Sequence, residues 1–170
     1  MGMRAFIIER DWSPGSRGKS VRRRPRGFTV IELLITMAII FTLAAIAIPS
    51  MLNAIGTARN ARAVGDVRTI GDEIMAYIAE YNVNPVDLSA AGYPNYQDPW
   101  GNRYVYLDFT ASGASSQMRR DQFLSPFNTY FDLYSKGADG LSTVSITTAV
   151  AQDDIFWAQD GDYVGLVSNY

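Results

Sequence analysis

Two hydrophobic patterns follow one another in the first half of the chain. From Leu33 to Ala58 there are 26 residues without a charged side chain. At about 1.5 Å per residue, a helix over this stretch is roughly 39 Å long, enough to cross a bilayer. Farther on, apolar residues recur at spacings of three and four, which is typical of an amphipathic helix: Val64, Val67, Ile70, Ile74, Ile78 and Tyr81. Together the patterns predict one long helix from Phe28 to about Tyr81.

Two residues in the second half of the apolar stretch weaken this helical pattern. Pro49 lacks an amide donor and crowds the carbonyl group of Ala45, and Gly56 has a low helix propensity. We therefore expect a bend or a melted turn between about Ala45 and Gly56.

The rest of the chain has short alternating segments separated by turn formers. Residues 82–97 are rich in turn-forming residues, and alternation typical of strands follows at 103–109, at 129–135 and around 163–167. Residues 110–128 have the composition of an irregular insertion, and 136–152 that of a loop. The prediction is an α+β fold in which a small antiparallel sheet packs on the second half of the long helix. The expected regions are a leader (1–27), a membrane and assembly helix (28–58) and a soluble domain (59–170).

Charge is divided unequally between the two ends of the chain. Residues 1–27 carry eight basic and two acidic side chains, and residues 28–170 carry seven basic and fifteen acidic ones. Positive charge before the apolar helix places the N-terminus in the cytoplasm and the rest outside. The acidic part disfavours nucleic acid and favours cations as partners. The chain has no Cys and no His, which excludes Cys-His, Ser-His-Asp and His-zinc chemistry, and we expect no enzymatic activity.

An acidic residue lies at the start of the apolar stretch. Glu32 is the fifth residue counted from Phe28, and a carboxylate near the membrane end of a helix needs a partner, so a functional role is expected. The run GFTVIELL, followed by apolar residues and Pro49, resembles the class III signal of type IV pilins and type II secretion pseudopilins. The resemblance implies cleavage between Gly27 and Phe28 by a prepilin peptidase, methylation of the new Phe28 amine, and retention of the helix for anchoring and assembly.

The same segment is also compatible with two simpler kinds of targeting sequence. In an ordinary signal anchor, Glu32 would reach the lipid headgroups. In a secretory signal peptide, the triplet Ala45-Ile46-Ala47 would be the cleavage site. The signal peptide puts Pro49 just after the cut, and it leaves the Gly-Phe step and Glu32 without a role.

Three further motifs narrow the resemblance. They are DPWGNRYVY (98–106), DLYSKGADG (132–140) and DDIFW (153–157), and they resemble the general secretion pathway protein G family, the major pseudopilins of type II secretion. That family implies a single-pass inner-membrane protein with a periplasmic domain, forming a helical homo-oligomeric filament that helps export folded proteins through an outer-membrane secretin. Implied partners are minor pseudopilins, the prepilin peptidase/methyltransferase and an inner-membrane assembly platform.

Two alternative functions stay open beside this one. The first is a type IV pilus or DNA-uptake pilin. The second is a monomeric anchored protein that binds or acts on carbohydrate with its acidic loop. We expect the DPWGN segment to be an ordinary turn, and the aromatic residues Phe156, Trp157 and Tyr163 to be core residues.

The same resemblance implies a calcium ion that holds the C-terminal loop. Calcium prefers six to eight oxygen ligands, and the candidate metal ligands are the carboxylates of Asp139, Asp153 and Asp154 with the carbonyls of Lys136 and Leu141. The chain departs from the family in two ways. Twelve residues separate Gly140 from Asp153, and Ala151 stands where a hydroxyl ligand is expected, so that Ser142, Thr143 or Ser145 replaces it or the ligand is lost. The alternative is a solvated acidic loop in which Asp139 caps its own turn.

Overall fold

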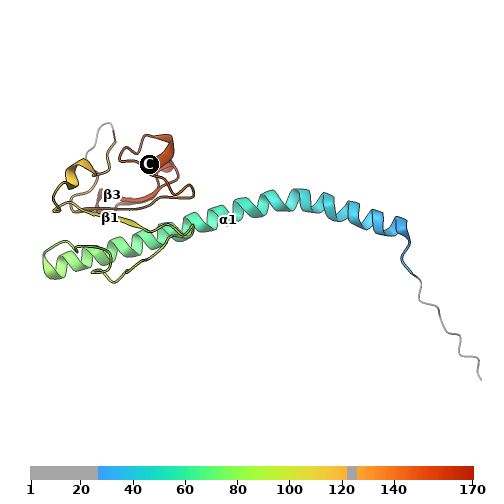
Figure 1. Ribbon diagram of the computed structural model, residues 1–170, viewed down its shortest axis with the longest axis horizontal. Coiled ribbons are helices and arrows are strands. Elements are labelled where there is room, and N and C mark those ends of the chain that lie inside the picture. The colour runs from blue at the N-terminus through green and yellow to red at the C-terminus, as the bar shows by residue number, and fades with distance from the viewer. Residues whose placement is uncertain (1–26, 122–125) are drawn as a thin grey trace, which may run out of the picture. The chain divides into compact units, whose positions relative to one another are not determined.

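A computed structural model describes residues 27–121 and 126–170. Its main helix, α1, spans Val30–Tyr81, a length of 52 residues, and so confirms the predicted long helix (Figure 1). The chain divides into two compact units, Met1–Leu43 and Ala44–Tyr170. Apart from Gly27, the predicted leader lies outside the described residues.

Four short strands form one sheet in the second unit. They are β1 (Val105–Asp108), β2 (Phe131–Ser135), β3 (Ile155–Ala158) and β4 (Tyr163–Leu166). Their order in the sheet is β1-β2-β3-β4 and each neighbouring pair is antiparallel. Four 3-10 turns lie between and after the strands: Ala114–Ser116, Ala149–Ala151, Gln159–Gly161 and Val167–Asn169. The predicted α+β class is therefore confirmed.

The sequence pattern predicts three of these strands. β1, β2 and β4 lie within the expected segments, whereas β3 has no counterpart among them. All four residues of β3 are buried, so this strand lacks the polar alternation that marks a half-exposed strand.

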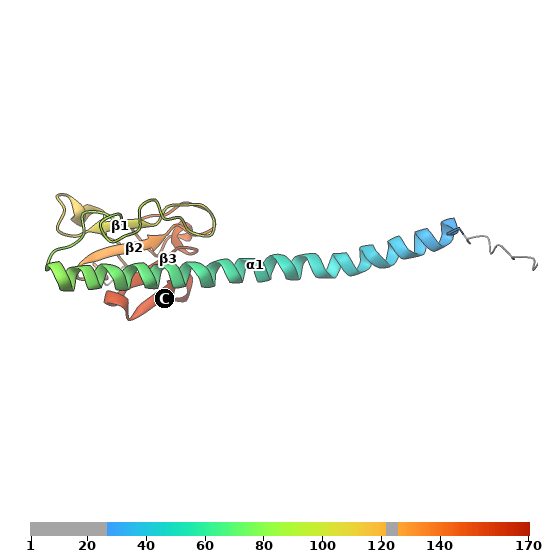
Figure 2. The ribbon, with the colours of Figure 1, turned by 90° about the horizontal axis from the view of Figure 1, so that it is seen from below.

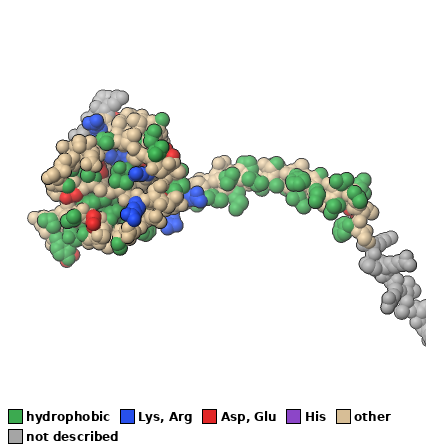
Figure 3. Space-filling model, viewed as in Figure 1, with side chains coloured by type: hydrophobic (Ala, Val, Ile, Leu, Met, Phe, Trp, Pro, Cys, Tyr) green, Lys and Arg blue, Asp and Glu red, His purple; other side chains and the backbone are tan. Residues whose placement is uncertain are grey.

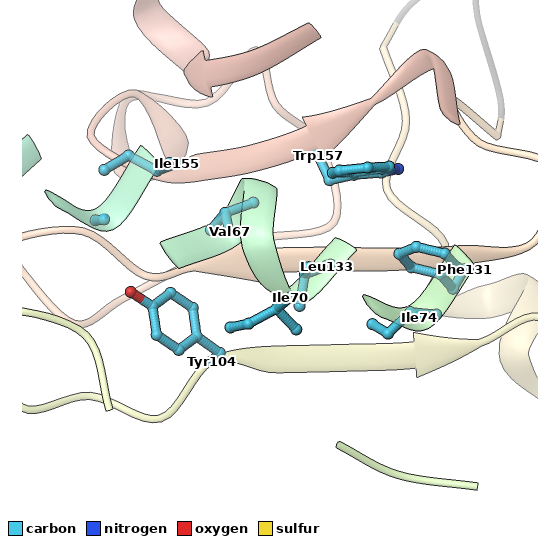
Figure 4. Close-up of a cluster of buried hydrophobic side chains, with 9 residues drawn as sticks. Val67, Ile70, Ile74, Tyr104, Phe131, Leu133, Ile155 and Trp157 are labelled. Carbon is cyan, nitrogen blue, oxygen red and sulfur yellow. The ribbon is translucent and has the colours of Figure 1, made fainter. Parts of the chain in front are cut away.

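The main core lies between the second half of α1 and one face of the sheet (Figures 2 and 4). It contains Ala63, Val67, Ile70 and Ile74 from the helix, packed against Tyr104, Phe131, Leu133, Ile155 and Trp157. Gly71 allows the close approach, because a Cβ atom there would lie 2.2 Å from the ring of Trp157. The predicted apolar stripe is confirmed from Val64 to Ile78. It is wrong for Tyr81, which is 55% exposed at the last residue of the helix and contacts Tyr77 instead.

A second core covers the opposite face of the sheet. Phe156 and Ala158 of β3 contact Phe127, Ile146 and Val167, with Tyr134 and Tyr163 packed beside them. The segment predicted as an irregular insertion and the loop after β2 thus supply apolar residues to this face. Consequently both faces of the sheet are covered, and Asp132 of β2 is buried, with an exposed fraction of 2%.

The first half of α1 remains helical through the predicted interruption. Residues 45–56, including Pro49 and Gly56, are all helical, so the structure has no melted turn there. A proline removes only one amide donor from the helix, and the regular turns on both sides maintain the rest. Figure 3 shows hydrophobic side chains along this half of the helix.

Candidate functional site

The start of α1 is closed by a reciprocal pair of hydrogen bonds. The amide and hydroxyl groups of Thr29 donate to Oε2 of Glu32, at 2.9 and 2.8 Å, and the amide of Glu32 donates to the Thr29 hydroxyl at 3.3 Å. This arrangement is a capping box, which satisfies amides that have no partner inside the helix. Its T-x-x-E signature is contiguous in the sequence, although the cap is not among the features predicted above.

The two residues of the predicted processing site precede this cap. Gly27 and Phe28 are exposed, and 85% of the Phe28 surface is accessible. Because α1 begins at Val30, the peptide bond between Gly27 and Phe28 lies outside the helix. Its amide is therefore not held by helical hydrogen bonds.

Exposed apolar side chains follow Glu32 along α1. Over residues 33–55 the exposed large residues are Leu33, Leu34, Ile35, Met37, Ile39, Ile40, Phe41, Leu43, Ile46, Ile48, Met51, Leu52 and Ile55. The polar groups within this stretch are satisfied locally, since the hydroxyls of Thr36 and Thr42 donate to the carbonyls of Leu33 and Ile39. Among the described residues one helix, α1, is long and apolar enough to span a membrane. Such a surface requires lipid or neighbouring helices around it.

The turn after β2 is attached to Asp153. Oδ2 of Asp153 accepts hydrogen bonds from the amides of Ala138 and Asp139, at 2.8 and 3.0 Å. Gly137 has a φ of 63°, and a Cβ atom there would lie 2.2 Å from the Asp153 carbonyl oxygen, so the close approach requires glycine. Oδ1 of Asp139 accepts the amide of Leu141 at 2.7 Å, which is the turn cap expected as the alternative to a metal ligand.

The DPWGN turn is bonded to the same place. Oδ1 of Asp98 accepts the amides of Trp100 and Asn102, as expected of an ordinary turn. Its Oδ2 also accepts the Ser135 hydroxyl at 2.6 Å, and the Asn102 side chain donates to the Gly137 carbonyl at 3.1 Å. The three family-like motifs, which are distant in sequence, are thus joined at one turn.

Asp154 points into the second core rather than toward this turn. It is fully buried, and its Oδ2 accepts Nη2 of Arg119 at 2.5 Å and the Ser142 hydroxyl at 2.6 Å. Burial raises the pKa of the Asp154 carboxyl, and the charge of Arg119 and the bond from Ser142 oppose that rise. Asp154 is therefore the acidic half of a buried ion pair.

Arg119 also contacts Asp132 through its backbone. The Arg119 amide donates to Oδ2 of Asp132 at 2.7 Å, and the Asn128 side chain donates to Oδ1 at 3.2 Å. Burial raises the pKa of Asp132 to about 6, although these two bonds and the charge of Arg119 lower it. The sequence pattern does not reveal Arg119, because an arginine in an irregular segment gives no sign that it will be buried.

Comparisons with known proteins match the N-terminal motif and most of the chain. Residues 22–48 match the family described as the prokaryotic N-terminal methylation motif. The chain is also 29% identical over 140 residues to the type II secretion system core protein G of Pseudomonas aeruginosa, across 70% of this chain and 87% of that protein. Both findings support the resemblance to the type IV pilin-like pseudopilins. No solved structure matches it.

In this chain the predicted calcium ligands are only partly brought together. Lys136 and Leu141 belong to the turn that carries Asp139, and Asp153 is bonded to that turn. Asp154 is paired with Arg119 instead. Its second oxygen, Oδ1, is buried without a hydrogen-bond partner among the described residues, but a divalent cation there would lie beside the guanidinium and be repelled. In residues 27–121 and 126–170 no group of three acidic side chains converges, so the donor set fits a calcium ion poorly.

Proposed function

We propose that this protein is a pseudopilin, a structural subunit of a periplasmic pseudopilus in type II secretion, and that it helps export folded proteins through an outer-membrane secretin. The observation that carries the proposal is the exposed apolar half of α1 with Glu32 at its start. A single chain leaves this surface uncovered. Lipid covers it before assembly, and the same halves of neighbouring subunits cover it in a filament.

Glu32 distinguishes an assembly helix from a plain anchor. In the single chain its carboxylate is held by Thr29 within the same helical turn. Burial of that carboxylate among apolar helices is unfavourable without an additional cationic partner. We propose that the amine of Phe28 on a neighbouring subunit is this partner, once cleavage has freed the amine. The capping box orients the carboxylate before the subunits meet.

The proposed partners follow from this role. They are further copies of the chain in a helical homo-oligomer, minor pseudopilins, the prepilin peptidase/methyltransferase and an inner-membrane assembly platform. The name of the relative refers to type II secretion, which favours a pseudopilus over a type IV pilus or a DNA-uptake pilus. The C-terminal unit is held in the periplasm by the inner-membrane helix.

The alternative of a ligand-binding or carbohydrate-acting protein has weaker support. A hollow of about 420 Å³ lies beside β1, lined by Tyr93, Tyr96, Tyr104 and Tyr106 together with Arg103 and residues of the 86–95 loop. This hollow does not include the acidic loop on which that alternative depends. Similarity to a core protein of a type II secretion system also favours a role without catalysis.

The test is expression of the full chain in a type II secretion host that lacks its own major pseudopilin. We expect membrane-bound protein with a methylated Phe28 N-terminus, short filaments in electron micrographs, and restored export of a secreted protein. Correct processing without filaments or export would contradict the proposal. A mature chain starting at Ile48 would show instead that the segment is a conventional signal peptide.

A further inference from the structure

Arg119 is the largest side chain that is fully buried among the described residues. It comes from the segment between β1 and β2, and its guanidinium lies 4.2 Å from the ring centroid of Tyr134, a cation–π distance. Nη2 contacts Asp154, and Nη1 donates to the Ser142 hydroxyl at 3.2 Å. A buried arginine is rare unless its charge is paired, and here Asp154 supplies the opposite charge.

The contacts of Arg119 join both ends of the C-terminal loop. Ser142 lies shortly after the turn at 136–141, and Asp154 directly precedes β3. Ser142 itself donates to Asp154 at 2.6 Å. One guanidinium therefore holds the beginning and the end of the loop together from the inside, across residues 143–153.

A second set of bonds closes the same loop at the surface without a metal ion. The carboxylate of Asp153 accepts the amides of Ala138 and Asp139, and Asp139 accepts the amide of Leu141. Each carboxylate is thus already partnered, two by backbone amides and the third by an arginine.

We propose that Arg119 supplies the cation that closes the C-terminal loop of this chain, in place of the calcium ion that the family resemblance implies. A guanidinium keeps its positive charge at any physiological pH, and its planar fork bonds Asp154 and Ser142 at the same time. The loop is consequently closed whether or not calcium is present. This inference concerns only residues 59–170, the predicted soluble domain (the soluble unit), and does not rest on filament assembly.

The first experiment compares thermal unfolding of the full-length chain in detergent, in calcium chloride and in a chelator. We expect the same melting temperature, and the same hydrogen exchange of residues 136–153, in both solutions. A melting temperature that rises in calcium, with the rise abolished by Asp139→Ala, would overturn the proposal, because a ligand bound only by the folded state stabilises it.

The second experiment removes the internal cation. Arg119→Met leaves Asp154 buried without its partner, and we expect a melting temperature lower by about 10 °C and faster hydrogen exchange in residues 136–153. The matched control is Arg120→Met, since Arg120 is the exposed neighbour, and there we expect a change within about 2 °C.

Two further variants separate pairing from simple loss of bulk. In Arg119→Met/Asp154→Leu no charge is left unpaired, so we expect less than half of the single-variant loss. Arg119→Lys keeps the charge but loses the fork, and an intermediate melting temperature is expected. If the double variant is destabilised by as much as the sum of Arg119→Met and Asp154→Leu, the two residues are not coupled and the proposal is wrong. If Arg119→Met does not fold, Arg119→Lys and the calcium comparison still decide.

Discussion

The first half of α1 differs from the far face of the sheet, the face covered by the second core, in where its polar groups find hydrogen-bond partners. Along residues 33–55 the large side chains are apolar and exposed, and the hydroxyls of Thr36 and Thr42 bond within their own helix. On the far face of the sheet, Arg119, Asp132 and Asp154 are buried among aromatic residues and bond to one another. The apolar surface of the helix is therefore available to partners outside the chain. The charged groups on the far face of the sheet are already paired within the chain.

This difference determines what each region tolerates. A substitution at the processing site or in the first half of α1 should affect processing or association while leaving the soluble unit folded. A change in the soluble unit should first lower its stability, and should affect assembly only as a consequence. Substitutions in each region can test that division, beginning with the largest expected effect.

Processing should be lost completely when the residue before the cut acquires a large side chain. We expect Gly27→Val to remain as precursor in the membrane, because the peptidase must accept a residue without a side chain at this position. Mass spectrometry of the membrane fraction will show whether the Phe28 N-terminus is absent. The melting temperature of the soluble unit should be unchanged, and a substantial processed fraction in Gly27→Val would contradict the prediction.

Assembly should fall at least tenfold in Glu32→Leu, while membrane insertion is retained. An apolar residue at this position favours lipid and cannot pair with the Phe28 amine of a neighbour. Filament yield in electron micrographs and the amount of membrane-bound subunit measure the two effects separately. Thr42→Val is the matched control, since it removes a polar group from the same surface, and it should assemble normally. Normal yield from Glu32→Leu would rule out the pairing.

The helix–sheet core should be destabilised by Gly71→Ala, by about 3 kcal/mol. The new methyl group would lie 2.2 Å from the Trp157 ring, and a packed core accommodates such a group only by moving. Thermal or denaturant unfolding of the full chain in detergent gives the value. Gly65→Ala is the control in the same helix, because nothing lies within 4 Å of its Cβ position, and it should be neutral or slightly stabilising. Equal stability of the two variants would show that the packing at Trp157 is not as described.

The stability of the soluble unit should fall as the pH rises from about 4 to 6. Burial raises the pKa of Asp132 from 3.8 to about 6, so in this interval the folded state holds a proton that the unfolded state has released, and unfolding becomes easier with each step in pH. The full shift corresponds to on the order of 3 kcal/mol. Asp154, whose pKa is also raised, contributes in the same direction.

Melting curves at a series of pH values will measure this effect. Asp132→Asn should flatten the dependence between pH 4 and 6, leaving the part that belongs to Asp154. A pH dependence that is identical in Asp132→Asn and the unmutated chain would show that Asp132 does not hold the proton.

The sequence by itself determined the long helix, its division into two halves, the α+β class and the position of three strands. These features depend on local periodicity and on the absence of charge over 26 residues, and each residue contributes to such patterns independently of distant ones. The candidate processing residues Gly27 and Phe28 and the candidate assembly residue Glu32 are predictable for the same reason, since their motif is contiguous. The capping box between Thr29 and Glu32 was equally local and equally predictable.

Only the tertiary structure decided which partners the acidic residues of the soluble unit bind. Asp153 and Asp154 are adjacent in sequence, yet one bonds to a surface turn and the other to a buried arginine 35 residues away. Which carboxylate is buried depends on where the segment between β1 and β2 places Arg119 on the far face of the sheet. No periodic pattern in that segment predicts this position. The pairing is set by burial: once Asp154 is enclosed, its charge requires a partner, and Arg119 is the cation that the fold places beside it.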